Sequence, residues 1–141
     1  MSNNIILSKD EEEFLKDFDS WIEIKKDMEL LEKMPTIKEG EVWWCGVGAN
    51  VGVEISGKGC RFSRPVLILK KLSRLGFMGV PLTSKSKTGS WYVSFELLGI
   101  KETAAICQAK TISVFRLYDK IGQVPKTDLE KVKEGFRKLY F

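Results

Sequence analysis

Histidine is missing from the 141-residue chain. Its absence excludes Ser-His-Asp and Cys-His catalysis and removes most zinc hydrolase sites. The three cysteines, Cys45, Cys60 and Cys107, are widely spaced and form no CxxC pair, which argues against a zinc site or a disulfide framework. We therefore expect reduced, mostly buried thiols, no metal and no cofactor.

Long apolar runs are also missing. No stretch approaches the roughly 20 residues that a membrane helix needs. The first residues, MSNNIILSKDEEE, have neither the basic start nor the apolar stretch of a signal peptide. We expect a cytoplasmic protein with no membrane partner, and at this length one main domain is the simplest arrangement.

Charge is unevenly distributed along the chain. Residues 1–39 hold 6 Lys and 11 Asp or Glu, a net charge of −5, whereas residues 40–141 hold 17 Lys or Arg and 8 Asp or Glu, a net charge of +9. A basic body is typical of proteins that bind polyanions. Ordinary solubility charge is the alternative, and the acidic arm could also cover a basic groove of its own chain.

The acidic arm has the pattern of an amphipathic helix. Apolar residues recur at helical spacing from Lys9 to Lys33, Ser8 and Glu11 fit a capping box, and Pro35 ends the pattern. We expect an N-terminal helical extension over residues 1–39 that packs on a barrel domain of residues 40–141. A second copy or another protein could cover the apolar face instead.

Short β-favouring runs separated by polar turns follow, and they predict a mainly β fold, a small barrel with helical additions. The expected strands are 41–46, 65–70, 76–82, 91–96, 103–107 with 110–113, and 120–124. Val114–Leu117 predicts a single helical turn, and a capping box at Thr127–Glu130 predicts a C-terminal helix that ends near Tyr140. The neighbours Trp43 and Trp44 point to opposite faces of the first strand, one toward the core and one toward a groove or an interface.

A glycine-rich loop of 17 residues, Val47–Ser63, separates the first two strands and is far longer than a usual hairpin turn. Pro65 at the start of the next strand holds Arg64 rigidly, and a guanidinium there can donate two parallel bonds to a phosphate. Thr83 ends a neighbouring strand and could donate to the same phosphate. Glu54 in the loop could act as a base or merely orient Arg64.

Lys85 and Lys87 follow Thr83 in a polar loop and could hold a nucleic-acid backbone. The Trp-Tyr pair that begins the next strand could stack on bases. Plainer interpretations remain open: an ion pair between the loop arginine and glutamate, a threonine that caps a turn, and a solvated lysine loop.

The strings GEVWWCGVGANVGVEISGKG, SRPVLIL, VPLTSK and QAKTISVFRLYDKIGQV resemble, in this order, the PemK/MazF family of toxins from bacterial type II toxin–antitoxin systems. The resemblance implies an SH3-like barrel, a homodimer, and a metal-independent endoribonuclease that cuts single-stranded RNA through attack of the 2′-OH. It also implies an antitoxin partner, with DNA contacted only through the antitoxin complex. The alternative is a non-catalytic module on the same barrel that binds nucleic acid or a target protein, as CcdB does.

The resemblance also implies site residues. In the family, the arginine before PVLI and the hydroxyl residue that ends the third strand act at the scissile phosphate, which implies catalytic roles for Arg64 and Thr83, with Glu54 as the third member. The expected RNA-binding residues are Lys58, Arg61, Lys85, Lys87, Gln108 and Lys110. Three features depart from the family: an insertion-like segment at 59–63, a lysine where the family often has the arginine of Gln-Ile-Arg, and the acidic helix from Lys9 to Lys33, which lies outside the shared core. The lysine keeps the charge but loses the bidentate fork.

Overall fold

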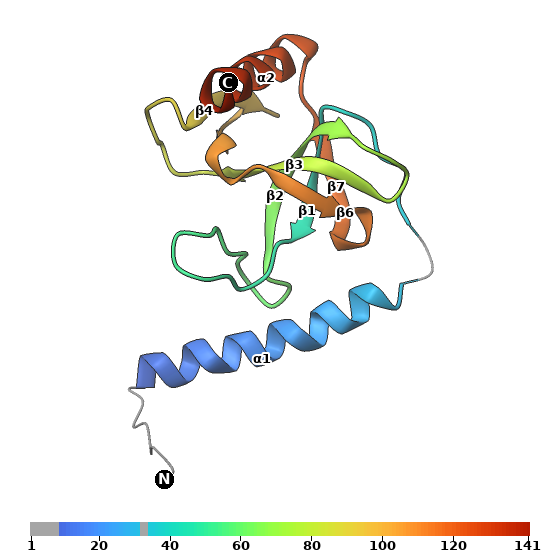
Figure 1. Cartoon of the computed structure of the whole chain (residues 1–141), viewed down its shortest axis with the longest axis vertical. Helices are drawn as coiled ribbons and strands as arrows, with labels where there is room; N and C mark the ends of the chain where they lie inside the picture. The colour runs from blue at the N-terminus through green and yellow to red at the C-terminus, as the bar shows by residue number, and fades with distance from the viewer. Residues whose placement is uncertain (1–8, 32–33) are drawn as a thin grey trace.

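The computed structural model describes residues 9–31 and 34–141, in which antiparallel strands form the body and a helix lies at each end (Figure 1). The elements are α1 (Lys9–Glu29), β1 (Glu41–Gly46), β2 (Ser63–Lys71), β3 (Gly76–Thr83), β4 (Tyr92–Leu97), β5 (Ile100–Ala105), η1 (Ile106–Gln108), β6 (Lys110–Ser113), η2 (Val114–Arg116), β7 (Leu117–Gln123) and α2 (Lys126–Tyr140). The predicted mainly β fold with an N-terminal and a C-terminal helix is confirmed.

Strand β3 pairs with three other strands, β2, β5 and β6. The strands follow the order β4-β5-β3-β2-β1-β7, and β6 pairs with β3 outside this path. The first half of β3 pairs with β6, whereas its end pairs with β5, where Thr83 lies opposite Thr103. On the other edge Val66 of β2 pairs with Pro81. Because the pairing is antiparallel, this register brings Arg64, two residues before Val66, toward Thr83, two residues after Pro81.

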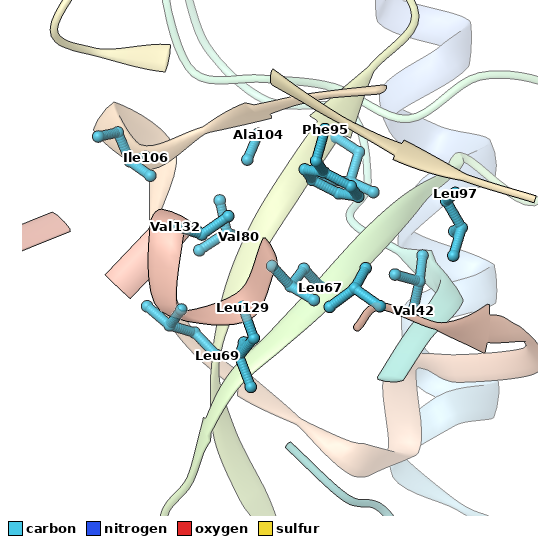
Figure 2. Packing of buried hydrophobic residues seen from close by; sticks show 12 residues of the cluster. Val42, Leu67, Leu69, Val80, Phe95, Leu97, Ala104, Ile106, Leu129 and Val132 are labelled. Carbon is cyan, nitrogen blue, oxygen red and sulfur yellow. The ribbon is translucent and has the colours of Figure 1, made fainter. Parts of the chain in front are cut away.

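The β2 strand is buried on both faces, because successive side chains of a strand point to opposite sides. Leu67 and Leu69 join a cluster beneath α2 (Figure 2), and Val66 and Ile68 join a second cluster that also contains Phe77. The first cluster contains Val42, Leu67, Leu69, Val80, Leu82, Phe95, Leu97, Ala104, Ile106, Val124, Leu129 and Val132. Arg64, at the start of β2, therefore lies two residues before the buried segment 66–69.

The N-terminal helix ends earlier than the sequence pattern predicts. It stops at Glu29, and the next two amides, of Leu30 and Leu31, bond to carbonyls three residues back, which tightens the last turn. The helical spacing of apolar residues therefore continues past the last helical residue and into a turn. Ser8 and Lys33 lie outside the described residues.

Within residues 17–29 of α1, whose side chains are described, Trp21 and Met28 are buried. The Trp21 ring lies 5.8 Å from the Phe62 ring, and the Arg116 guanidinium lies 5.5 Å from Trp21. A Cβ on Gly48 would lie 2.4 Å from the Trp21 ring, so the helix contacts the backbone of the β1–β2 loop closely. Figure 1 shows this loop between the strands and α1. These contacts support an extension over 1–39 that packs on the rest of the chain, a division that stays a prediction.

The β4–β5 hairpin differs from the prediction. Leu98 and Gly99 both have positive φ, 52° and 77°, which is the two-residue turn whose twist suits a hairpin. The strand after it therefore begins at Ile100 instead of residue 103, and Ile106–Gln108 forms a 3₁₀ turn where the strand was expected to continue.

Three smaller predictions are corrected. The last strand spans Leu117–Gln123, and thus begins earlier than expected. The capping box at 127–130 is wrong: Pro125 is the N-cap of α2, no side chain caps the helix, and Thr127 already lies in its first turn. The thiols are not mostly buried, since only Cys45 is buried, Cys107 is half-buried and Cys60 is exposed in the long loop.

Candidate functional site

The Arg64 guanidinium is fixed at the junction of the β1–β2 loop and β3. Its Nε donates to the Ser56 carbonyl at 3.0 Å and its Nη1 donates to the Leu82 carbonyl at 3.4 Å. Arginine has five N–H donors, so three remain for a ligand. Burial lowers the pKa of Arg64, although an arginine stays charged in proteins. Among the described residues no carboxylate pairs with it, and its positive charge is therefore available to an anion.

Thr83 both caps a turn and keeps a free donor. Its Oγ1 accepts from the Lys85 amide at 3.2 Å, as the plainer interpretation of this residue suggested. A hydroxyl that accepts one bond can still donate its own hydrogen. Thr83 can therefore hold the loop and donate to an anion at the same time.

A cavity of about 230 Å³, here called the Thr83 cavity, brings most of the predicted site residues together. Its lining residues are Val53, Ile55, Lys58, Arg64, Thr83, Lys85, Lys87, Tyr92, Ala105 and Gln108. Among the described residues the lining contains four cations and no carboxylate. One cation, Lys87, also lies 5.9 Å from the centre of the Tyr92 ring. The cavity is suited to a phosphate with neighbouring phosphates and bases.

Three predicted site residues do not line this cavity. The carboxylate of Glu54 is exposed and accepts from the Val51 amide at 3.1 Å, so the suggested ion pair with Arg64 is not formed. The Arg61 guanidinium lies 4.2 Å from the centre of the Tyr118 ring and 3.7 Å from Asp119, toward β7. Lys110 is exposed at the start of β6. Their proposed roles stay predictions.

Gln108 holds the long loop in place. Its Oε1 accepts from the Ile55 amide at 3.2 Å and its Nε2 donates to the Val53 carbonyl at 3.0 Å. These bonds join residues more than 50 positions apart and place both loop residues in the Thr83 cavity. The Gln108 amide is engaged by the loop backbone, and its expected contact with RNA stays a prediction.

The loop itself is tightly bonded despite its glycines. The Asn50 side chain donates to the carbonyls of Val47 and Ile55 at 3.0 and 2.8 Å. The Gly57 amide donates to the Gly48 carbonyl, and a Cβ on Gly57 would lie 1.7 Å from the Phe62 carbonyl oxygen, so only glycine fits there. This network fixes the Ser56 carbonyl that accepts from Arg64.

A second cavity, of about 430 Å³, shares Arg64 and Lys58 with the first. This Trp44 cavity is lined by Trp44, Lys58, Gly59, Ser63, Arg64, Pro65, Leu82, Ser84 and Glu102. The Trp44 ring is 38% exposed, while Trp43 packs against the second core cluster. The predicted division of the tryptophan pair between core and groove is confirmed.

Sequence reasoning missed Glu102. Burial raises the pKa of its carboxyl group. Glu102 precedes Thr103 on β5 and Ser84 follows Thr83 at the end of β3. Because the two threonines pair in an antiparallel register, Glu102 lies near Ser84. The signal that could have found it is the Leu98-Gly99 dipeptide: a two-residue turn there fixes the register of β5.

Neither cavity is lined by a described residue of α1. The interpretation of the acidic arm as a cover over a basic groove is therefore not supported. Among residues 9–31 and 34–141, no three His, Cys, Asp or Glu side chains gather closely enough to hold a metal ion. Within the same part of the chain, no helix is long and apolar enough to cross a membrane.

Several solved bacterial proteins have a similar fold. An endoribonuclease from a mycobacterial species, solved in complex with its cognate antitoxin, is 18% identical, with a TM-score of 0.56, 74% of this chain covered and 92% of that one. MazF from Deinococcus radiodurans is 17% identical, with a TM-score of 0.58 and coverages of 77% and 97%. The MazE–MazF structure from the same organism is 16% identical, with a TM-score of 0.56 and coverages of 77% and 96%. These likenesses show a shared fold.

Among curated proteins, none matches the chain. The family of PemK-like, MazF-like toxins of type II toxin–antitoxin systems matches residues 38–140. The match spans every strand, the long loop, Arg64, Thr83 and the C-terminal helix, and therefore most of the chain. On this evidence the chain belongs to the PemK-like, MazF-like toxins of type II toxin–antitoxin systems.

Proposed function

We propose that this toxin is a metal-independent endoribonuclease that cuts single-stranded RNA in the cytoplasm. The observation that carries the proposal is the Thr83 cavity, where Arg64 has three unused N–H donors beside the Thr83 hydroxyl and three lysines. The similar mycobacterial protein is an endoribonuclease. That protein and the Deinococcus toxin were each solved with an antitoxin, which supports an antitoxin partner here. A homodimer, and DNA contact only through the antitoxin complex, complete the proposal.

The proposed reaction needs no metal. The ribose 2′-oxygen attacks the neighbouring phosphorus as a base takes its proton, the bond between phosphorus and the 5′-oxygen breaks, and the 5′-oxygen takes a proton from water as it leaves. The products are a 2′,3′-cyclic phosphate and a free 5′-hydroxyl. Arg64 and Thr83 donate to the phosphate oxygens, whose negative charge rises in the transition state, and preorganised donors are the largest catalytic term in such reactions.

Glu54 is the proposed base. Its neighbours Val53 and Ile55 line the Thr83 cavity, whereas its own carboxylate accepts from the Val51 amide outside it. Catalytic hydrogen bonds often align only once substrate is bound, so this position does not rule Glu54 out. In the proposal the carboxylate leaves the Val51 amide when RNA enters.

A second candidate function is binding without cleavage. It is favoured by one observation: within the described residues, no carboxylate lines the Thr83 cavity. A basic cavity that lacks a base would hold RNA, or an acidic target protein, without cutting it.

The test is an RNA cleavage assay in EDTA with the purified full chain. We expect the wild type to release products with 2′,3′-cyclic phosphate and 5′-hydroxyl ends, and Arg64→Ala to lose at least about a hundredfold in rate. Arg74→Ala is the matched control, because Arg74 is exposed in the β2–β3 turn and lines neither cavity.

The outcomes separate the two functions. Unchanged cleavage by Arg64→Ala would contradict the site assignment. RNA binding that weakens with salt but yields no product from the wild type would establish the non-catalytic alternative. Activity that EDTA removes would contradict the metal-independent reaction.

A further inference from the structure

The Trp44 cavity has the composition of a nucleobase site. It combines an exposed indole from β1, a carboxylate from β5 and the hydroxyl-bearing Ser84, and it shares Arg64 with the Thr83 cavity. Its volume of about 430 Å³ lies within the usual range for small-molecule sites, about 300–1,000 Å³. Single-stranded RNA is read in sites of this kind, where a base stacks on an aromatic ring and bonds along its Watson–Crick edge.

The Glu102 carboxylate is the distinctive group of this cavity. In the described part of the chain, no cation or hydrogen-bond donor pairs with it. Burial raises its pKa, which is what partial removal from water without a paired charge produces. A partly buried, unpaired carboxylate is stabilised by any ligand that donates two hydrogen bonds to it.

The neighbouring arginine fixes which part of an RNA reaches Glu102. Arg64 and Lys58 line both cavities, so a phosphate held at Arg64 leaves one nucleoside toward Thr83 and the next toward Trp44. Glu102 and Thr83 line different cavities, which places the carboxylate beside the base of the adjacent nucleotide and away from the reacting 2′-OH. This position favours a role for Glu102 in nucleobase recognition over a role in proton transfer.

We propose that the Trp44 cavity binds guanine next to the scissile phosphate, with Trp44 stacked on the base and Glu102 accepting from its N1–H and N2–H. Guanine alone among the four bases offers two adjacent donors on its Watson–Crick edge. Adenine and cytosine each place an acceptor beside their amino group, and an ionised carboxylate repels that acceptor. This inference rests on the proposed RNA-cleaving function, for which it names a sequence preference.

Cleavage of an RNA pool with randomised positions around the cut tests the preference. We expect wild-type products to be enriched in guanine at one position next to the cut. Glu102→Gln should reduce that enrichment by about tenfold, because a bidentate base contact discriminates by that order. Glu96→Gln is the matched control, since Glu96 is exposed on β4 and lines neither cavity. Unchanged enrichment in Glu102→Gln would overturn the proposal.

A binding experiment keeps the inference separate from catalysis. The probes are short RNAs that carry 2′-O-methyl groups and therefore cannot be cut. One probe has a single guanosine among uridines, and the other has a single inosine, which lacks the N2 amine, at the same position. We expect the full-length wild type to bind the guanosine RNA several-fold more tightly and Glu102→Gln to bind both equally. If no RNA is ever cut but this discrimination appears, the proposed function fails and the guanine site stands.

Trp44 provides the remaining test. Trp44→Ala should weaken binding of these RNAs by about tenfold, because stacking on an aromatic ring is worth roughly that much per base, while Trp44→Phe should keep most of the affinity. If Trp44→Ala instead converts a dimer to monomers and leaves the guanosine preference unchanged, the cavity is covered by a second copy of the chain. That result would overturn the proposal.

Discussion

At the scale of single residues, Glu41 is a buried carboxylate with an unusually complete set of partners. Its Oε1 accepts from the Lys38 amide at 2.6 Å and from the Trp43 indole at 3.3 Å, and its Oε2 lies 2.7 Å from the Lys120 ammonium. Burial alone would raise the pKa of Glu41, but these partners outweigh it and the pKa is lowered. Glu41 therefore joins β1 to β7 as an ionised group.

The sign of this pKa shift predicts a pH-dependent contribution to stability. Since the folded-state pKa lies below the ordinary value of 4.5, the stabilisation is present above that value and is lost as pH falls through the folded-state pKa. Glu41→Gln should lower the free energy of unfolding by about 1–3 kcal/mol at pH 7, the usual worth of hydrogen bonds to a charged group. Urea unfolding at several pH values measures it.

The same titration contains its own check. The difference between wild type and Glu41→Gln should shrink as the pH falls below 4.5, because protonation neutralises the wild-type carboxylate as well. Glu96→Gln, an exposed change of the same kind, should be near neutral at every pH. A Glu41→Gln deficit that stays constant down to pH 3 would show that the ion pair contributes nothing and that packing alone is affected.

Two arginines near the end of the long loop show how far residue-level prediction could go. Arg64 and Arg61 are three positions apart and have the same charge, yet the first lines both cavities and the second stacks on Tyr118. Pro65 was expected to begin the strand after Arg64, but β2 already begins at Ser63, so Arg64 is its second residue and Pro65 its third. No sequence feature near Arg61 predicted that its guanidinium would contact Tyr118 and Asp119, which lie 57 and 58 residues later.

At the scale of elements, α1 supports the loop that positions Arg64. Trp21 packs on Phe62 and against Gly48, whose amide donates to the Phe62 carbonyl and whose carbonyl accepts from Gly57. Next to Gly57 lies the Ser56 carbonyl that holds Arg64. A continuous chain of contacts therefore runs from the helix to the guanidinium.

This chain predicts that Trp21 acts on the site through the loop. Trp21→Ala should reduce hydrogen-exchange protection of the Gly48 and Gly57 amides and slow RNA cleavage several-fold, with a larger change in kcat than in KM because Arg64 is misplaced. Ile22→Ala is the control, since Ile22 is 47% exposed on the same helix. Loss of thermal stability with unchanged loop protection and cleavage would mean that Trp21 only anchors the helix.

Elements with strong apolar patterns were predictable, and those defined by distant partners were not. The apolar run of β1 gave the bounds Glu41–Gly46 that the structure shows. The order of the long loop depends on Gln108, which lies 53 residues from Ile55 in sequence, so the glycine-rich sequence of the loop could not predict it. Glu102 was missed for a related reason: its place in a cavity depends on the register between β3 and β5.

At the scale of the whole molecule, the charge asymmetry of the chain has a spatial counterpart. The Thr83 cavity lies in the basic part of the chain and collects Lys58, Arg64, Lys85 and Lys87. The acidic helix lies on the other side of the long loop, as Figure 1 shows, and none of its described residues lines the cavity. The described residues of the acidic helix therefore leave the basic cavity uncovered.

This arrangement predicts how salt affects RNA binding. Each phosphate neutralised on a single strand contributes about 0.7 to the slope of log K against log salt concentration. Lys85→Ala with Lys87→Ala should therefore reduce that slope by about 1.4, measured by fluorescence anisotropy with a 2′-O-methyl RNA. Lys126→Ala with Lys138→Ala removes the same charge from α2, where neither residue lines either cavity, and should change the slope by much less. Equal reductions in the two double variants would show that RNA binding depends on the net charge of the molecule and that the Thr83 cavity is not the binding site.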